Sequence, residues 1–111
     1  MFVKTANDKN FKEATASKMP VVVDFYGTWC GPCKAMAPSL EKVAEERSPA
    51  ITFYKVDIDD SPSASQQFRI SGVPTLIIMS EGKEVARKVG AMNKGGLDLW
   101  LNSELEKLGN K

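Results

Sequence analysis

The chain has 111 residues, enough for one compact domain over residues 1–111 whose core needs neither a metal nor several disulfides. Its 15 Lys and Arg residues against 14 Asp and Glu residues give a net charge of +1, and no basic run could follow a phosphate backbone, so we expect no nucleic-acid or membrane partner. Two cysteines and no histidine cannot supply the four ligands of a zinc site within one chain, although a metal site shared between two chains stays open.

The N-terminal segment bears on the compartment. Residues 1–8 turn polar at once and lack the apolar core of a signal peptide, and no apolar run is long enough to span a membrane. We therefore expect a soluble, monomeric, cytoplasmic protein. A presequence removed during maturation would leave no trace, so a mature organellar form stays open.

The first third of the chain predicts two strands separated by a helix. Residues 2–5 favour a short edge strand, and Asn7 or Asp8 can cap the weakly amphipathic helix that follows. Residues 21–26 are apolar on both faces except at Asp24. That pattern is typical of a central strand covered by helices on both sides.

The middle of the chain predicts helix, strand and helix. Between residues 33 and 47, apolar side chains recur at helical spacing among Lys and Glu, and Pro38 should kink this helix. Residues 51–58 are rich in strand-forming side chains. Ser61 and Pro62 are typical of the cap and first residue of a short third helix.

The last third predicts a hairpin and a closing helix. Residues 75–79 and 84–89 flank Glu81-Gly82-Lys83, in which Gly82 supplies the turn. Apolar residues from Leu97 to Leu108 line one face of a helix capped by Asn93, with Gly109 beyond its end. Parallel units followed by an antiparallel hairpin indicate an α/β fold with a mixed central sheet and helices on both faces.

Cys30 and Cys33 predict the chemistry. Cysteines three apart on a first helical turn can bond or separate with little backbone movement, and a loop so short restrains little chain entropy, so reactivity explains the pair better than stabilisation. Unpaired amides at the strand-to-helix junction should favour the thiolate of Cys30 below the free pKa of about 8.5, which makes Cys30 the nucleophile. Cys33, one turn inside, should be more shielded and act as the resolving thiol. The alternative is a pair of small buried hydrophobes.

Asp24 is the second candidate for a chemical role. A carboxyl group in a central strand should have a raised pKa, which suits a general acid/base serving the resolving thiol, since the chain has no histidine. A hydrogen-bonded structural role is the alternative. Lys55, in another core strand, is a candidate partner of Asp24 or a lysine whose head reaches solvent.

Two further residues have open interpretations at this point. Pro74, in Val73-Pro74-Thr75, is either a strand-opening proline or one that follows a cis peptide bond. Trp29 either packs on the helix or contributes to a binding surface.

These residues together resemble the thioredoxin family. The strand from Val21 runs into Trp29-Cys30-Gly31-Pro32-Cys33-Lys34, and Asp24, Pro38, Lys55, the loop Ser71 to Thr75, Gly82 and Gly90 match the family over nearly the whole chain. The resemblance implies a sheet of about five strands with about four helices, and a cis peptide at Pro74. It also implies a substrate groove made by Trp29, Gly31, Pro32, Val73, Pro74, Gly90 and Ala91.

The resemblance further implies a protein-disulfide reductase with Cys30 and Cys33 as its redox disulfide. No bound cofactor is expected, because an NADPH- or ferredoxin-dependent thioredoxin reductase would supply electrons. Gly-Pro between the cysteines resembles reducing members of the superfamily, with a potential of about −270 mV. Tyr26 and Gly27 depart from the frequent Trp and Ala, which could alter packing behind Cys33 and partner preference.

Two rival functions remain at this stage. The same residues could serve an oxidant or isomerase working in the opposite direction, which a potential near −120 to −180 mV would indicate. The surface around Trp29, Val73 and Pro74 could instead make the chain a non-catalytic binding subunit.

Overall fold

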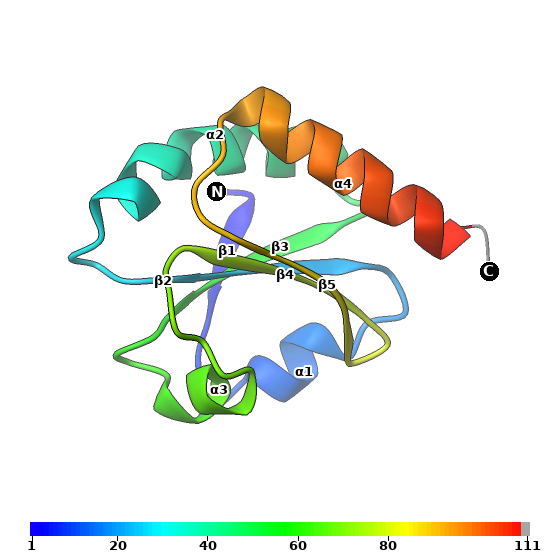
Figure 1. The fold of residues 1–111 in the computed structure, drawn as a ribbon. Helices are drawn as coiled ribbons and strands as arrows, with labels where there is room; N and C mark the ends of the chain where they lie inside the picture. Colours follow the sequence, from blue (N-terminus) through cyan, green and yellow to red (C-terminus); the bar gives the residue numbers. More distant parts are fainter. Residues whose placement is uncertain (110–111) are drawn as a thin grey trace.

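The computed structural model describes residues 1–109 and shows five strands and four helices (Figure 1). In chain order the elements are β1 Val3–Ala6, α1 Phe11–Thr15, β2 Val21–Tyr26, α2 Gly31–Arg47, β3 Thr52–Asp57, α3 Pro62–Gln67, β4 Thr75–Ser80, β5 Lys83–Val89 and α4 Lys94–Gly109.

The strands form one mixed sheet in the order β1-β3-β2-β4-β5. Strands β1, β3 and β2 run parallel, whereas β4 is antiparallel to β2 and pairs with β5 as a hairpin. The mixed sheet and its terminal hairpin confirm the prediction. Strand β2, which carries Asp24, lies in the middle of the sheet between β3 and β4.

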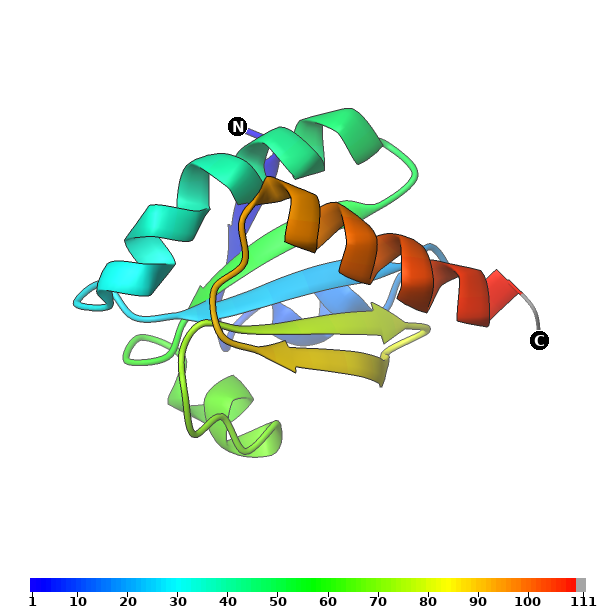
Figure 2. The ribbon, with the colours of Figure 1, turned by 45° about the horizontal axis from the view of Figure 1, so that its top comes forward.

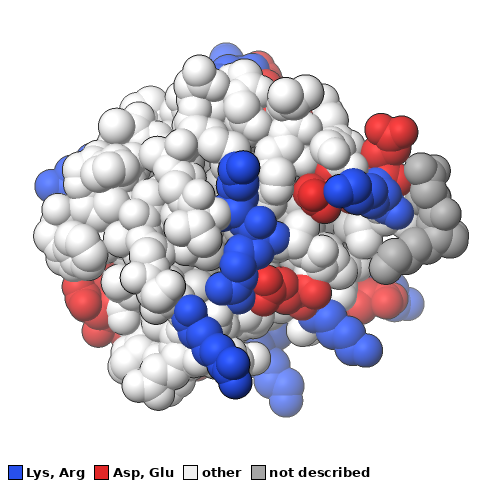
Figure 3. Space-filling view, in the orientation of Figure 1, with Lys and Arg blue, Asp and Glu red and all other residues white. Residues whose placement is uncertain are grey.

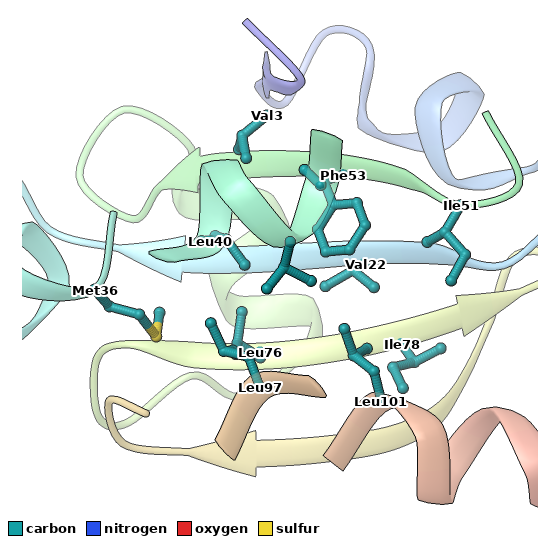
Figure 4. Packing of buried hydrophobic residues seen from close by; sticks show 12 residues of the cluster. Val3, Val22, Met36, Leu40, Ile51, Phe53, Leu76, Ile78, Leu97 and Leu101 are labelled. Atoms are coloured by element: carbon teal, nitrogen blue, oxygen red, sulfur yellow. The ribbon is translucent and has the colours of Figure 1, made fainter. Parts of the chain in front are cut away.

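Helices cover both faces of the sheet, α2 and α4 on one side and α1 and α3 on the other (Figure 1). Because successive side chains of a strand point to opposite faces, Val22 of β2 joins the core under α2 and α4, and Val23 joins the core on the other face. Figure 4 shows Met36 and Leu40 of α2 and Leu97 and Leu101 of α4 meeting the first of these layers. Three phenylalanines, Phe11, Phe25 and Phe68, pack together in the second.

Helix caps differ from the sequence-based expectation at two places. Neither Asn7 nor Asp8 caps α1, whose N-cap is Asn10 without a side-chain hydrogen bond. Asp8 instead accepts hydrogen bonds from the Ser63 and Ala64 amides, at 3.0 and 2.9 Å. Asp8 therefore supplies the acceptors for the first backbone amides of α3. Ser61, which was expected to cap this helix, makes no side-chain cap hydrogen bond.

The ends of α2 and α4 also differ from the prediction. Helix α2 begins at Gly31, two residues before the predicted start at Cys33, and contains Pro38 within it. Gly109 is the last residue of α4 and does not lie beyond its end. Asn93 caps α4 as predicted, since its Oδ1 accepts a hydrogen bond from the Gly96 amide at 2.8 Å.

The end of the sheet where α2 begins gathers the loops that matter for function. Figures 1 and 2 both place the loop between β2 and α2 near the loop between β3 and α3. In Figure 3 this end of the visible face carries few charged side chains, whereas Lys and Arg gather in the middle of the face. Within residues 1–109, no helix combines the length and the apolar character needed to cross a membrane.

Candidate active site

Cys30 and Cys33 form a disulfide at the N-terminus of α2, with their Cα atoms 5.3 Å apart. Strand β2 ends at Tyr26, and Cys30 is the extended residue that caps the helix, at φ −88° and ψ 111°. The Cys30 Sγ accepts a hydrogen bond from the Cys33 amide at 3.2 Å. A sulfur placed at this amide and at the positive end of the helix dipole is set up to carry negative charge once the disulfide is reduced.

The exposure of the two cysteines does not separate them as the sequence suggested. Each is 4% exposed, so Cys33 is no more shielded than Cys30 in the disulfide form. Cys30 is covered because its Sγ lies 3.8 Å from the carbonyl oxygen of Val73, a loop residue 43 positions away. This is a contact and not a hydrogen bond, since an oxidised sulfur carries no proton.

The Val73-Pro74 peptide bond is cis, as the resemblance implied. The Pro74 carbonyl accepts a hydrogen bond from the Gly90 amide at 2.8 Å, which ties this loop to the end of β5. Gly90 has φ +105°, a conformation that favours glycine. A second cis bond, Ser48-Pro49, lies at the other end of α2 and was not anticipated.

The expected groove residues divide into those that the structure joins by contacts and those that are simply exposed nearby. Contacts join Cys30, Val73, Pro74 and Gly90. Trp29 is 63% exposed, and Gly31, Pro32 and Ala91 are also exposed. Among residues 1–109 the amide and carbonyl of Val73 have no backbone hydrogen-bond partner.

Asp24 is buried in the middle of the sheet, with 6% of its surface exposed. Its Oδ1 has no hydrogen-bond partner within the described part of the chain. Burial raises the pKa of Asp24 from 3.8 to about 7, against an opposing effect of the Lys55 cation. The raised pKa that the strand position predicted is therefore confirmed.

A partly open cavity of about 320 Å³ connects Asp24 with the disulfide. Its lining includes Asp24, Cys33 and Lys55, together with Tyr26, Gly27, Thr28, Lys34 and Ala37. Cys30 does not line it, and neither do Val73, Pro74 and Gly90. Asp24 and Cys33 thus share a cavity that none of the expected groove residues lines.

Lys55 lies directly opposite Asp24 in the pairing of β2 with β3. No ion pair within 4 Å joins the two among the described residues, so Lys55 acts on Asp24 through its field. Its ammonium lies 5.8 Å from the centre of the Tyr26 ring, within the range of a cation–π contact. Tyr26 therefore helps to place the cation beside the cavity.

One residue near the site had no signal in the sequence. Asp59 Oδ2 accepts a hydrogen bond from Trp29 Nε1 at 2.8 Å, although the two residues are 30 positions apart. Asp59 is one of several acids in a turn, and neither periodicity nor spacing distinguishes it. Over residues 1–109, no group of three His, Cys, Asp or Glu side chains is arranged to hold a metal ion.

The sequence model of the thioredoxin family matches residues 2–103. Thioredoxin of Chlamydia trachomatis is 45% identical over 95 residues, which cover 86% of this chain and 91% of that protein. Thioredoxin of Acidithiobacillus ferridurans is 42% identical over 100 residues, covering 89% and 93%. The crystal structure of Malassezia sympodialis thioredoxin superposes with a TM-score of 0.84 at 32% identity, covering 92% of this chain and 90% of that one.

The family model covers most of the chain, and the solved thioredoxin shares its fold. The chain belongs to the thioredoxin family, and it is a thiol-disulfide oxidoreductase with Cys30 and Cys33 as its redox-active disulfide.

Proposed function

We propose that the protein reduces disulfides in other proteins through a mixed disulfide formed by Cys30. The observation that carries this proposal is the Cys30 Sγ, which accepts the Cys33 amide hydrogen at the start of α2 and lies against Val73. The helix end stabilises the attacking thiolate, and the free backbone groups of Val73 can hold the target strand beside it.

The reaction transfers two electrons to the target in two exchange steps. The Cys30 thiolate attacks one sulfur of the target disulfide, forms the mixed disulfide and releases the other target sulfur, which takes up a proton. Cys33 then loses its proton and attacks the Cys30 Sγ. The Cys30–Cys33 disulfide forms, and the second target thiol leaves reduced.

Asp24 is proposed as the group that accepts the Cys33 proton. A general base is most effective when its pKa lies near the working pH, and the pKa of Asp24 is about 7. It shares its cavity with Cys33 and not with Cys30, which fits a role in the second step. Lys55, whose field lowers the pKa of Asp24, is proposed to keep the carboxyl group able to ionise near neutrality.

The groove proposed for the target consists of the residues expected from the sequence: Trp29, Gly31, Pro32, Val73, Pro74, Gly90 and Ala91. A thioredoxin reductase is proposed to restore the dithiol. A bifunctional thioredoxin reductase/thioredoxin of Mycobacterium leprae supports this partner, since 78% of this chain matches 19% of that protein at 42% identity. The cytoplasmic location stays a prediction that cell fractionation would test.

A trapping experiment tests the mechanism. Cys33→Ser should accumulate covalent complexes with target proteins under oxidising conditions, while the matched variant Cys30→Ser should not, because only Cys30 attacks. Complexes that form equally through Cys33 in the Cys30→Ser variant would contradict the assigned order.

The potential and the double variant separate the rival functions. Equilibration with glutathione should give about −270 mV for a reductase, whereas a value near −120 to −180 mV would favour an oxidant or isomerase. Full biological activity of a Cys30→Ser/Cys33→Ser variant would favour a non-catalytic binding role.

A further inference from the structure

Glu41 of α2 holds the first residues of the chain with both oxygens of its carboxylate. The Phe2 amide donates to Glu41 Oε2 at 2.6 Å, and the Val3 amide donates to Oε1 at 3.0 Å. Val3 is buried in the core, whereas Phe2 is 43% exposed, so packing fixes Val3 more firmly than the residue before it. Figure 2 shows the start of the chain beside α2. The Glu41 carboxylate therefore clamps a segment that the core holds only in part.

The clamped segment forms one wall of a second cavity at Asp24. This cavity of about 50 Å³ is partly open and is lined by Met1, Val3, Asp24, Ala37, Leu40, Glu41 and Lys55. Asp24, Ala37 and Lys55 also line the larger cavity that contains Cys33. Because a space this small admits only a few water molecules, the wall limits how far the Asp24 carboxyl group is hydrated from this side.

The course of α2 explains why Glu41 lies here. Cys33, Ala37 and Glu41 follow one another at intervals of four residues, so they lie on one side of the helix. Along this side, the small side chain of Ala37 leaves room between the other two. The same helix thus brings the resolving cysteine to one cavity at Asp24 and the clamp to the other.

The charges around Asp24 keep the clamp ionised. Burial raises the pKa of Glu41, but the hydrogen bonds from the Val3 and Phe2 amides, the terminal amino group and the Lys55 cation lower it more. Glu41 is therefore an anion that can accept both amides near neutral pH. The titratable groups that line the two cavities around Asp24 are Tyr26, Cys33, Lys34, Glu41 and Lys55.

We propose that Glu41 is a positioning residue for the proton exchange between Cys33 and Asp24, because it holds the start of the chain as a wall that limits the hydration of Asp24. The proposal rests on the disulfide-reductase function proposed above. Loss of the clamp would let water reach the Asp24 carboxyl group, stabilise its charged form and make it a weaker base for Cys33. Glu41 itself takes up no proton in the reaction.

An NMR titration of Asp24 in the oxidised protein tests the clamp. Glu41→Gln removes the charge and keeps one acceptor oxygen, whereas Phe2→Pro keeps the charge and removes one amide donor. Each should raise the acid dissociation constant of Asp24 about threefold, a decrease in its pKa of about 0.5. The double variant should show less than the sum of the two decreases, because both changes release the same segment.

Two matched variants separate the clamp from its alternatives. Glu45→Gln removes an exposed acid one turn further along α2, which pairs with Lys42 at 3.7 Å. Phe2→Ala removes the side chain and keeps the amide donor. Both should leave the dissociation constant of Asp24 within about 1.5-fold of its original value. A change in Glu41→Gln without one in Phe2→Pro would show that charge alone matters, and no change in either would show that the clamp does not affect Asp24. Each of these results would overturn the proposal.

The pH dependence of the resolving step tests the consequence for the reaction. Reduced protein mixed with excess dithiobis(nitrobenzoate), a small aromatic disulfide, should release its coloured thiolate in two phases. Cys30 attacks the reagent in the first, and Cys33 attacks the Cys30 Sγ in the second, at a rate independent of reagent concentration.

The midpoint of the second-phase pH profile should fall by about 0.5 in Glu41→Gln and in Phe2→Pro, in step with the pKa of Asp24. A lowered pKa of Asp24 with an unmoved profile would overturn the positioning role. Absence of the second phase in the unsubstituted protein would instead contradict the proposed function, whereas the titration of Asp24 would still test the clamp.

Discussion

Replacing Asp24 by asparagine removes a charge from the middle of the sheet while keeping the shape of the side chain. Asp24 is 6% exposed and its Oδ1 has no partner among residues 1–109. Burial raises its pKa from 3.8 to about 7 because the folded protein disfavours the charged form. Asparagine is neutral at every pH, so the variant should not bear the free-energy cost of burying a carboxylate charge, which the original protein bears as the pH rises.

The size of the effect follows from linkage. The unfolded chain loses the Asp24 proton near pH 3.8, whereas the folded protein keeps it to about pH 7. The contribution of Asp24 to the free energy of unfolding is therefore complete below pH 3.8 and is lost as the pH rises from there through about 7. At 1.36 kcal/mol per pKa unit the full loss is about 4 kcal/mol, of which about 3 kcal/mol falls between pH 5 and pH 8.5. The free energy of unfolding of Asp24→Asn, relative to that of the original protein, should therefore grow by about 3 kcal/mol between pH 5 and pH 8.5.

Urea unfolding of the oxidised protein at pH 5 and pH 8.5 measures this difference. Asp60→Asn, at an exposed carboxylate, should keep the original pH dependence and serves as the control. If the free energies of unfolding of Asp24→Asn and the original protein differ equally at both pH values, burial of Asp24 does not control its ionisation and the reasoning fails.

Three other substitutions test single contacts. Lys55→Met removes the cation whose field lowers the pKa of Asp24, so an NMR titration of Asp24 should give a pKa above 7; a lower value would refute the assigned sign. Asp8→Ala should lower the free energy of unfolding by about 1 kcal/mol because two amides of α3 lose their acceptors, and Asp8→Asn, which keeps one acceptor oxygen, should recover about half of it. Glu41→Ala should speed hydrogen exchange of the Val3 amide, which donates to Glu41 Oε1 at 3.0 Å, with unchanged exchange in β4 as the internal control.

Much of the fold could be predicted because local patterns determine it. Residues 21–26 are apolar except at Asp24, and this pattern correctly indicated a central strand. A strand buries the side chains on both of its faces only when helices cover the sheet on both sides. Gly82 in a short polar interval correctly indicated the hairpin, and Glu81 and Gly82 both have positive φ, as a tight two-residue turn requires. The cysteine spacing likewise placed the disulfide on the first turn of α2.

Contacts between distant segments could not be predicted in this way. Asp8 is acidic and lies before a helix, which suits a cap for α1, yet the fold brings it to α3, 55 residues away. Asp59 meets Trp29 only because the loops after β2 and β3 end at the same edge of the sheet. The cover over Cys30 comes from Val73, again from a separate loop. The cis bond at Pro74 was implied by resemblance, because X-Pro composition alone does not distinguish the isomers.

The division of the site between a cavity and a groove leads to one more expectation. Asp24 and Cys33 line the same cavity, so in the reduced protein a carboxylate and a thiolate would lie in one partly open space and each would disfavour the charge of the other. Such groups titrate as a coupled pair in two macroscopic steps. An NMR pH titration of reduced protein with ¹³C-labelled cysteine should therefore show at the Cys33 Cβ a step from Asp24 in addition to those of the two thiols, and Asp24→Asn should remove one step. An unchanged number of steps in Asp24→Asn would mean that Asp24 does not exchange protons with the resolving thiol.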